Sequence, residues 1–393
     1  MREPLATLGL SAAQIEDRGA RFTAREIAQQ PQVWPEVARL VAGDAALGGF
    51  LKRLRADPAL RVVLTGAGTS AFIGECLAPA LARSAVRVEA IATTDIVASP
   101  DTWLAPRAPT LLISFARSGN SPESVAAVQL AEECLAQCAH LIVTCNAQGE
   151  LYRRSHAMRD THALLLPEAL NDQSFAMTSS FTGMLLAAAS AFGVARSDDG
   201  GVAALSALAA HVLHGWMPKL LELVRTEFER VVYLGSNELK GLGRESALKM
   251  LELSDGRVVA AADSPLGFRH GPKTILNDRT LVVMFMSNDA YTRRYEMDLL
   301  QELRREAVAA SVVAISNRED LPVHRDTLVL GDRPAAPGAL NDLELCLPYV
   351  VFAQSLAMLR SLSLGLSPDQ PNAAGTVNRV VQGVSIHPFP RSR

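Results

Sequence analysis

Short apolar runs alternate with longer amphipathic stretches from residue 62 onward. The runs are VVLT at 62, LLISF at 111, LIVTC at 141 and LLLP at 164, and each ends in or is followed by small or polar residues. This alternation predicts a parallel sheet wrapped by helices. The chain before residue 61 is more polar and helical in pattern. Thr23 and Glu26 have the spacing of a capping box there, and Pro31 and Pro35 punctuate the pattern.

The second half of the chain repeats the order of the first. VVYLG at 231, LVVMF at 281 and VVAISN at 312 follow the runs at 62, 111 and 141 in the same order and at a near-constant offset. Apolar runs of this kind occur in all α/β proteins, but an offset that barely changes across three of them favours duplication. We therefore expect a helical leader at 1–50, a first α/β domain at 51–200 and a second at 201–365. The remaining segment, 366–393, is too apolar at Val380, Val381 and Val384 to be a free tail.

Composition limits the classes of function. The 393 residues include 38 Lys and Arg against 41 Asp and Glu, so the net charge of −3 favours neither nucleic acid nor an anionic membrane as a partner. Any anionic ligand must therefore be bound locally. With 49% apolar and 20% charged residues, the chain has the composition of a globular protein and not of a disordered one.

The cysteines and the apolar stretches indicate an intracellular protein. The five cysteines are odd in number and contain no CxxC pair, which is typical of reduced packing cysteines. The start MREPLATLGL has no apolar signal core, and the stretch 183–195, taken as the most apolar, is too short to span a bilayer. We expect a soluble cytoplasmic protein.

Two loops that follow predicted strands could bind an anion. Gly66 to Ser70 follows VVLT, and the stretch ARSGNSP at 116–122 follows LLISF. Both combine glycine with hydroxyl groups, and Pro122 behind Ser121 marks a helix start, where the helix dipole favours negative charge. Because strand-to-helix loops of a parallel sheet meet at its carboxyl edge, a small phosphate ester between them is the favoured interpretation.

Two alternatives to phosphate binding remain. Gly66-x-Gly68-x-x-Ala71, with Glu89 further along, fits the loose dinucleotide fingerprint, although such a lone match is weak. It does not explain the second hydroxyl-rich loop. The loop serines could also serve only as helix N-caps.

A helix-patterned stretch after VVYLGS carries three charged residues. Glu245, Lys249 and Glu252 are spaced i, i+4, i+7 and so project from one face. For an isolated helix they would form a solvated ion pair. Here the helix follows a strand end, and His270 lies in the next loop, where a histidine beside a carboxylate and an ammonium could transfer protons at neutral pH.

Metal and nucleophile sites are not indicated. His211 and His214, at i, i+3, are the only closely spaced histidines, and they have no acidic residue nearby. The chain contains no GxSxG elbow and no Walker A loop. We expect no metal and no cofactor.

Five motifs in order resemble a known family. GAGTSAFIG, ISFARSGNSPESVAAV, RESALKMLELSDG, GFRHGPK and GTVNRVVQGV are similar to the double sugar-isomerase (SIS) proteins, in particular to the galactosamine-6-phosphate deaminase/isomerase group called AgaS or tagatose-6-phosphate ketose/aldose isomerase. The resemblance covers nearly the whole chain from about residue 20. It implies two tandem flavodoxin-like α/β/α lobes with parallel sheets.

The isomerase half of glucosamine-6-phosphate synthase is a more distant relative and suggests roles for single residues. Its catalytic helix matches Glu245, Lys249 and Glu252, the last being the base that moves a proton between C1 and C2. Its ring-opening histidine matches His270, which in that family comes from the neighbouring subunit, so a homodimer or higher homo-oligomer is implied. The residues that would contact substrate are Gly68, Thr69, Ser70, Arg117, Ser118, Gly119, Asn120, Ser121, Thr178, Ser179 and, in the tail, Arg379.

The chain departs from the synthase pattern in three places. Ala116 and Arg117 stand where the synthase loop begins Ser-Gln, so a guanidinium could replace a hydroxyl. The tail lysine of the synthase has no counterpart, and Asn378 or Arg379 is the candidate substitute within a tail expected to pack near the active site. The start MREPL has no cysteine nucleophile of a glutaminase, which favours release of ammonia over its transfer.

The resemblance implies an enzyme acting on a sugar phosphate. The expected reaction converts galactosamine 6-phosphate to tagatose 6-phosphate and ammonia through aldose-ketose proton transfer. A simple aldose/ketose 6-phosphate isomerase, a glucosamine-6-phosphate deaminase and a non-catalytic sugar-phosphate sensor remain alternatives. A sensor usually carries a DNA-binding helix-turn-helix, and the leader is neither basic nor long enough to suggest one.

Overall fold

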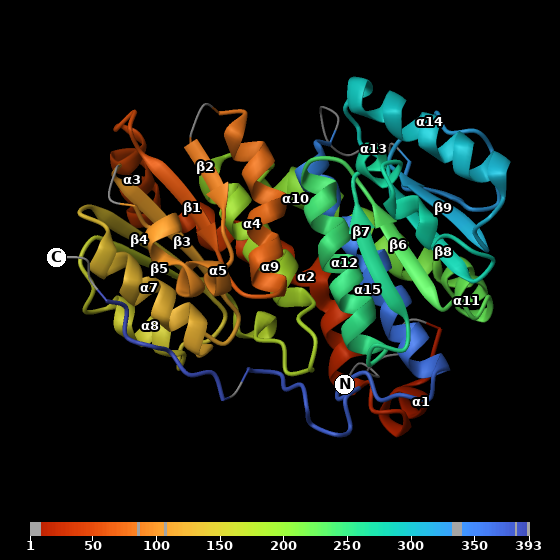
Figure 1. Cartoon of the computed structure of the whole chain (residues 1–393), viewed down its shortest axis with the longest axis horizontal. Coiled ribbons are helices and arrows are strands. Elements are labelled where there is room, and N and C mark those ends of the chain that lie inside the picture. Colours follow the sequence, from red (N-terminus) through yellow and green to blue (C-terminus); the bar gives the residue numbers. More distant parts are fainter. Residues whose placement is uncertain (1–8, 85–86, 106–107, 332–339, 382, 391–393) are drawn as a thin grey trace. The chain divides into compact units, whose positions relative to one another are not determined.

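The computed structural model describes residues 9–84, 87–105, 108–331, 340–381 and 383–390. The chain forms two compact units, each built on one sheet (Figure 1). The first-sheet unit comprises 36–172, 179–197 and 374–393, and the second-sheet unit comprises 1–35, 173–178 and 198–373. Each unit thus takes in segments that lie far apart in the sequence.

The first sheet has five parallel strands in the order β2-β1-β3-β4-β5. β1 and β3 are buried along their whole length, as expected of strands that helices cover on both faces. This order is the flavodoxin-like one. The strands are β1 (Arg61–Thr65), β2 (Arg87–Ala90), β3 (Thr110–Ala116), β4 (Cys138–Thr144) and β5 (Thr161–Leu165).

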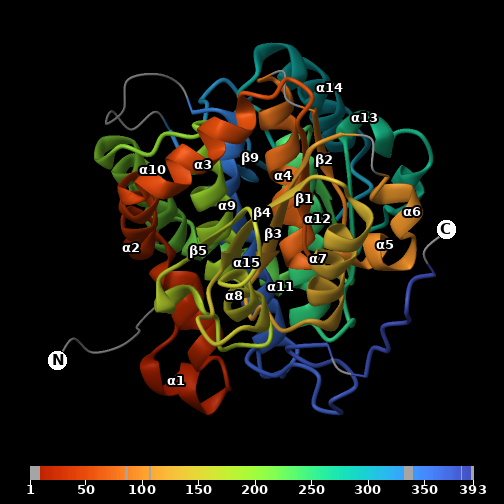
Figure 2. The same cartoon turned by 90° about the vertical axis from the view of Figure 1, so that its left-hand side faces the viewer.

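Helices cover both faces of the first sheet (Figures 1 and 2). On one face α9 packs against α3 and α4, and on the other α7 packs against α5, α6 and α8. Aliphatic side chains of β1, β3 and β4 form the core together with those of α7. The helices are α3 (Ala45–Arg55), α4 (Thr69–Ala82), α5 (Thr93–Ala98), α6 (Pro100–Trp103), α7 (Pro122–Cys134), α8 (Glu150–Ser155) and α9 (Ser179–Phe192), with a 3-10 turn, η1 (Glu168–Leu170).

The second sheet has the same strand order as the first. Its five parallel strands run β10-β9-β8-β6-β7, so β6 takes the place of β1 and β8 that of β3. This repetition confirms the duplication predicted from the sequence offsets. The strands are β6 (Arg230–Leu234), β7 (Val259–Asp263), β8 (Thr280–Phe285), β9 (Ser311–Ser316) and β10 (Thr327–Val329).

The second-sheet unit also has helices on both faces of its sheet. α15 packs against α10, α11 and α12, while α14 packs against α13 and β9. α2 (Arg21–Gly43) contributes residues to both units. The other helices are α1 (Ala12–Asp17), α10 (Asp199–Gly215), α11 (Met217–Arg225), α12 (Glu238–Leu253), α13 (Pro265–Phe268), α14 (Ala290–Glu306) and α15 (Asp342–Ser363), with a 3-10 turn, η2 (Pro272–Ile275).

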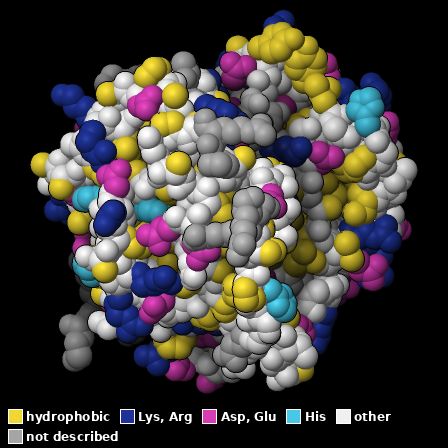
Figure 3. All heavy atoms as spheres, turned by 60° about the vertical axis from the view of Figure 1, so that its left-hand side comes forward, with side chains coloured by type: hydrophobic (Ala, Val, Ile, Leu, Met, Phe, Trp, Pro, Cys, Tyr) yellow, Lys and Arg dark blue, Asp and Glu magenta, His cyan; other side chains and the backbone are white. Residues whose placement is uncertain are grey.

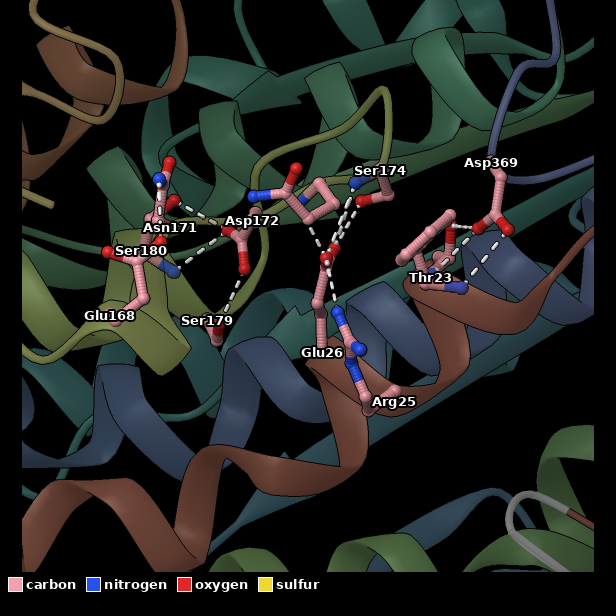
Figure 4. A network of polar contacts seen from close by, with 12 residues as sticks. Thr23, Arg25, Glu26, Glu168, Asn171, Asp172, Ser174, Ser179, Ser180 and Asp369 are labelled. Carbon is pink, nitrogen blue, oxygen red and sulfur yellow. Dashed lines mark hydrogen bonds and ion pairs between the residues drawn. The ribbon is translucent and has the colours of Figure 1, made fainter. Parts of the chain in front are cut away.

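The predicted capping box at Thr23 is wrong. α2 begins at Arg21, and the carboxylate that accepts from its first turn belongs to Asp369, which receives the backbone N–H of Phe22 at 3.0 Å and of Thr23 at 2.7 Å. Glu26 instead accepts from the backbone N–H of Gln173 at 2.6 Å. Residues distant in sequence supply these partners, so local spacing could not reveal them (Figure 4).

One described helix, α15, is long and apolar enough to cross a membrane by length and composition. Its apolar window is 100% buried inside the protein, as for the core helix of a compact unit. No two described cysteines form a disulfide. On the face in view in Figure 3, basic and acidic side chains are interspersed.

Candidate functional site

The first candidate anion loop joins β1 to α4. Gly68 is the N-cap residue of α4 and has a positive φ of 55° with ψ of −127°, a conformation that glycine adopts at little cost. Thr69 and Ser70 form the first helical positions, and both side chains are buried. A Cβ on Gly66 would lie 2.6 Å from the backbone carbon of Ser70, so the loop closes tightly over the helix start.

Buried hydroxyls lie toward the carboxyl ends of the first three strands. Thr65 at the end of β1 is paired in register with Ser114 of β3, and Thr93 begins the helix that follows β2. Within the described part of the chain, none of these three hydroxyl oxygens has a hydrogen-bond partner. Buried polar atoms are normally paired, so this edge of the sheet is the polar one expected at a ligand site.

The second candidate loop joins β3 to α7 and is stiffened by its neighbours. Gly119 has a φ of 65°, and its carbonyl accepts from the backbone of Leu151 at 3.0 Å. The Asn120 side chain accepts from the N–H of Glu150 at 2.9 Å, so it caps the start of α8. The Ser118 hydroxyl accepts from the N–H of Asn120 at 3.3 Å, and the Ser121 hydroxyl contacts Ser124 at 2.6 Å.

Arg117 connects this loop to the C-terminal segment of the same unit. Its guanidinium donates to the carbonyl of Arg379 at 2.8 Å, and the side chain is buried. The Arg379 guanidinium in turn donates to the carbonyl of Asp172, with the Nε–O distance 3.2 Å. Asn378, the other candidate from the tail, contacts the carbonyl of Gly375 at 3.4 Å. The roles of Arg117 and Arg379 toward substrate stay predictions.

Asp172 organises the start of α9, which carries the predicted sugar contacts (Figure 4). Its buried carboxylate accepts from the Ser179 hydroxyl, and from the Ser180 N–H at 2.9 Å and hydroxyl at 2.6 Å. The Ser179 hydroxyl therefore donates its hydrogen bond to a residue of the first-sheet unit. In the second-sheet unit, the Thr178 carbonyl accepts from Gln354 at 3.2 Å.

The three charged residues of α12 form one buried cluster in the second-sheet unit. Lys249 is fully buried, as is Glu245, and their charged atoms lie 3.6 Å apart. The Lys249 ammonium also donates to Glu252, whose side chain is 24% exposed. The prediction that the three share one face is confirmed. A buried ammonium is costly even when paired, and Glu252 is the one member of the cluster whose carboxylate reaches solvent.

His270 lies on the surface of the second-sheet unit, after α13. Gly271 has a φ of 118°, and the loop is fixed to α14 by ion pairs. Arg269 contacts Glu302 at 2.7 Å, and Lys273 contacts Glu302 and Glu306. These bonds hold the backbone on both sides of His270 while the imidazole stays exposed.

Two observations bear on the metal and dinucleotide alternatives. Among the described residues, no group of three or more His, Cys, Asp or Glu could hold a metal ion. The Glu89 carboxylate, which a dinucleotide fingerprint would assign to a ribose, forms ion pairs with Arg61 and, at 3.3 Å, with Arg87.

Comparison with known proteins places the chain in a family. The SIS-domain family matches residues 57–193. AgaS of Streptomyces coelicolor is 50% identical over 378 residues, which are 94% of this chain and 96% of that protein. The chain belongs to the AgaS family of SIS-domain proteins. Another AgaS relative, the D-galactosamine-6-phosphate deaminase AgaS of Shewanella sp. (strain ANA-3), is 42% identical over 98% of this chain and 96% of its own.

A solved structure supports the AgaS assignment. The tagatose-6-phosphate ketose/aldose isomerase of Escherichia coli superposes with a TM-score of 0.81 at 38% identity, covering 94% of this chain and 97% of that one. The distant resemblance is also confirmed. The glutamine--fructose-6-phosphate aminotransferase of Leifsonia xyli is 25% identical over 89% of this chain and 57% of its own length.

Sequence reasoning missed the acids that hold the loops. Asp172, Asp369 and Glu296 are each hydrogen-bonded to backbone N–H groups, yet nothing in their local spacing marks them. Of the three acids, only Glu296 could have been found from the sequence. Its partner Ser287 follows β8 as Arg117 follows β3, so the internal repeat marks the loop that Glu296 binds.

Proposed function

We propose that this protein is an enzyme that converts galactosamine 6-phosphate and water to tagatose 6-phosphate and ammonia. The observation that carries the proposal is the buried Glu245–Lys249–Glu252 cluster on α12, in a chain of the AgaS family. A non-catalytic sensor would not need a fully buried ammonium beside a partly exposed carboxylate. The reaction is hydrolytic and would take place in the cytoplasm.

The loops of the first-sheet unit would bind the phosphate. Its donors would be the backbone N–H groups of Gly68, Thr69, Ser118 and Ser121 and the hydroxyls of Thr69, Ser70 and Ser118, and both loops lead into helix starts whose dipoles favour an anion. Asn120 contributes by fixing the second loop through Glu150. Anchoring the phosphate at the far end of the sugar uses binding energy to position C1 and C2.

Proton transfer would fall to the second-sheet unit. His270 opens the pyranose ring and so exposes the aldehyde. Its exposed position on a fixed loop allows it to serve the neighbouring subunit of a homo-oligomer. Glu252 then removes the proton from C2 and returns it to C1, while Lys249 stabilises the charge of the intermediate. With an amino group at C2 the product is a ketimine, and water converts it to the ketose and ammonia.

A ketose/aldose isomerase is the second candidate, and the likeness to the Escherichia coli isomerase structure favours it. The same proton transfer on a sugar with a hydroxyl at C2 gives a ketose without loss of nitrogen. The two candidates therefore share every residue named above and differ only in the C2 substituent. Glucosamine 6-phosphate, the gluco epimer, is a third substrate for comparison.

The substrate test separates these candidates. Purified protein is given galactosamine 6-phosphate, glucosamine 6-phosphate or galactose 6-phosphate, and both ammonia and ketose phosphate are measured. We expect ammonia and tagatose 6-phosphate in equal amounts from the first compound. A ketose from galactose 6-phosphate with no ammonia from either amino sugar would make the protein an isomerase. Thermal stabilisation by these compounds without any turnover would make it a sensor.

A further inference from the structure

The second-sheet unit repeats, at the start of α12, the loop that precedes α4 in the first-sheet unit. Asn237 is the N-cap residue of α12 as Gly68 is of α4, and it has nearly the same backbone angles, φ 50° and ψ −119° against φ 55° and ψ −127°. Gly235 follows β6 as Gly66 follows β1, and a Cβ on Gly235 would lie 2.4 Å from the carbonyl oxygen of Leu239. The loop shape is thus kept, although a non-glycine residue adopts it only at a cost in strain.

In the second-sheet unit a carboxyl group of the protein itself occupies this loop. The Ser236 hydroxyl donates to Glu296 Oε1 at 2.8 Å, and the backbone N–H of Ser287 donates to Glu296 Oε2 at 2.7 Å. Ser287 follows β8 as Arg117 follows β3 in the first copy of the fold. The fully buried Glu296 side chain therefore receives one donor from each of the two loops that correspond to the anion loops of the first-sheet unit.

A second carboxyl group takes up the remaining donors of the β8 loop. Asp342, at the start of α15, accepts from the Ser287 hydroxyl and from the backbone N–H of Asn288, the latter at 2.7 Å. Arg293 of α14 donates to the Ser287 carbonyl at 2.9 Å. Both loops of the second-sheet unit thus have donors bonded to acids on α14 and α15.

We propose that Glu296 is a built-in anion, which takes in the second copy of the fold the place that substrate phosphate takes in the first. Each chain would therefore bind phosphate at one of its two copies. Glu296 is also a positioning residue for catalysis, because Ser236 directly precedes Asn237, the N-cap residue of α12, and α12 carries Glu245, Lys249 and Glu252. The kinetic part of this inference rests on the proposed function, and the binding part does not.

Chemical rescue tests the built-in anion. In the full-length protein, Glu296→Ala removes the carboxyl group and leaves a space of its shape. At pH 8, sodium formate should raise the melting temperature of this variant more than sodium chloride of equal ionic strength does. Formate should not do so for the wild type or for Asp298→Ala, which removes an exposed acid from the same helix. A folded Glu296→Ala protein that responds to both salts alike would overturn the proposal.

Kinetics test the positioning role. We expect Glu296→Ala to lower kcat about tenfold, with KM for the sugar phosphate within about twofold of wild type, because the phosphate loops lie in the first-sheet unit. Formate should restore part of kcat, and Glu296→Gln, which can still accept from Ser287, should keep most of it. Unchanged kcat in a folded Glu296→Ala protein overturns this role.

Two further measurements keep the tests independent. Should Glu296→Ala not fold, Ser236→Ala removes one donor to the same carboxyl group and is expected to lower kcat without changing KM. An unchanged kcat in Ser236→Ala would contradict the positioning role.

The proposed function and the built-in anion can fail separately. A wild type that does not deaminate refutes the proposed function alone, since formate rescue is read from thermal unfolding. An active wild type with unresponsive Glu296 variants refutes only the built-in anion.

Discussion

Burial, and to a smaller extent the nearby Asp342 on α15, raise the pKa of Glu296 to about 7, although the hydrogen bonds from Ser287 and Ser236 and the charge of Arg293 on α14 act to lower it. In the unfolded chain the carboxyl group titrates near its ordinary pKa of 4.5. Between these two values the folded state keeps a proton that the unfolded state has lost. Stability therefore falls as the pH rises through this range, by at most about 1.4 kcal/mol per pH unit from this group.

Glu296→Gln should remove this part of the pH dependence. Urea unfolding at pH 5, 6, 7 and 8 is expected to show a smaller loss of stability with rising pH in the variant, by on the order of 3 kcal/mol over the range. The raised pKa of Asp342, caused mainly by its burial, contributes a slope of the same sign to both proteins. Asp298→Asn serves as the control. A variant with the slope of the wild type would contradict this assignment.

At the residue scale, local patterns revealed the charged cluster on α12 and missed the acids that bind backbone N–H groups elsewhere in the chain. Glu245, Lys249 and Glu252 lie on one helix, so their spacing alone placed them together, and the structure confirms this. Asp172 and Asp369 bind backbone groups that other parts of the chain supply. Such partners depend on tertiary packing, which a single sequence does not contain.

At the scale of elements, the two loops before α4 and α12 have one backbone shape and different residues. Gly68→Ala should destabilise the protein by roughly 1–3 kcal/mol, since alanine is strained at φ 55° and ψ −127°. Asn237→Gly should stabilise it by roughly 1 kcal/mol, because glycine relieves the strain and loses only part of this gain through chain entropy. Urea unfolding measures both changes.

Ligand binding distinguishes these two loops further. Stabilisation by sugar phosphate should be weakened in Gly68→Ala and kept in Asn237→Gly, since only the first loop is proposed to hold the phosphate. Equal losses in both variants would count against a single phosphate site per chain.

The strands were the most predictable elements. The runs at 62, 111 and 141 became β1, β3 and β4, and their repeats became β6, β8 and β9, because buried parallel strands need continuous aliphatic sequence. The start of α2 was predicted less well. Thr23 and Glu26 have the spacing of a capping box, yet Asp369 and the segment at 173–174 supply their partners, so the spacing gave a wrong prediction.

At the scale of the whole molecule, the two copies of one fold differ in the loops that follow their first and third strands in sequence. The first copy keeps donors and buried hydroxyls at the carboxyl edge of its sheet. In the second copy, Glu296 and Asp342 accept hydrogen bonds from the equivalent loops. The Glu245–Lys249–Glu252 cluster lies on α12, the helix that begins after the first of these loops. Binding and proton transfer would thus be divided between two copies of one ancestral unit.

The rate of ammonia release from galactosamine 6-phosphate by Glu252→Gln tests the central claim most directly. Glutamine keeps the size of the side chain and cannot accept the C2 proton, so we expect the rate to fall about 10²–10⁴-fold. Glu222→Gln is the matched control. Glu222 forms an ion pair at 2.9 Å with Lys219, at the i, i+3 spacing that Lys249 and Glu252 also have, but on the exposed side of α11. Wild-type rates in Glu222→Gln and the loss in Glu252→Gln are the predicted result, and a Glu252→Gln protein as active as wild type would contradict the account.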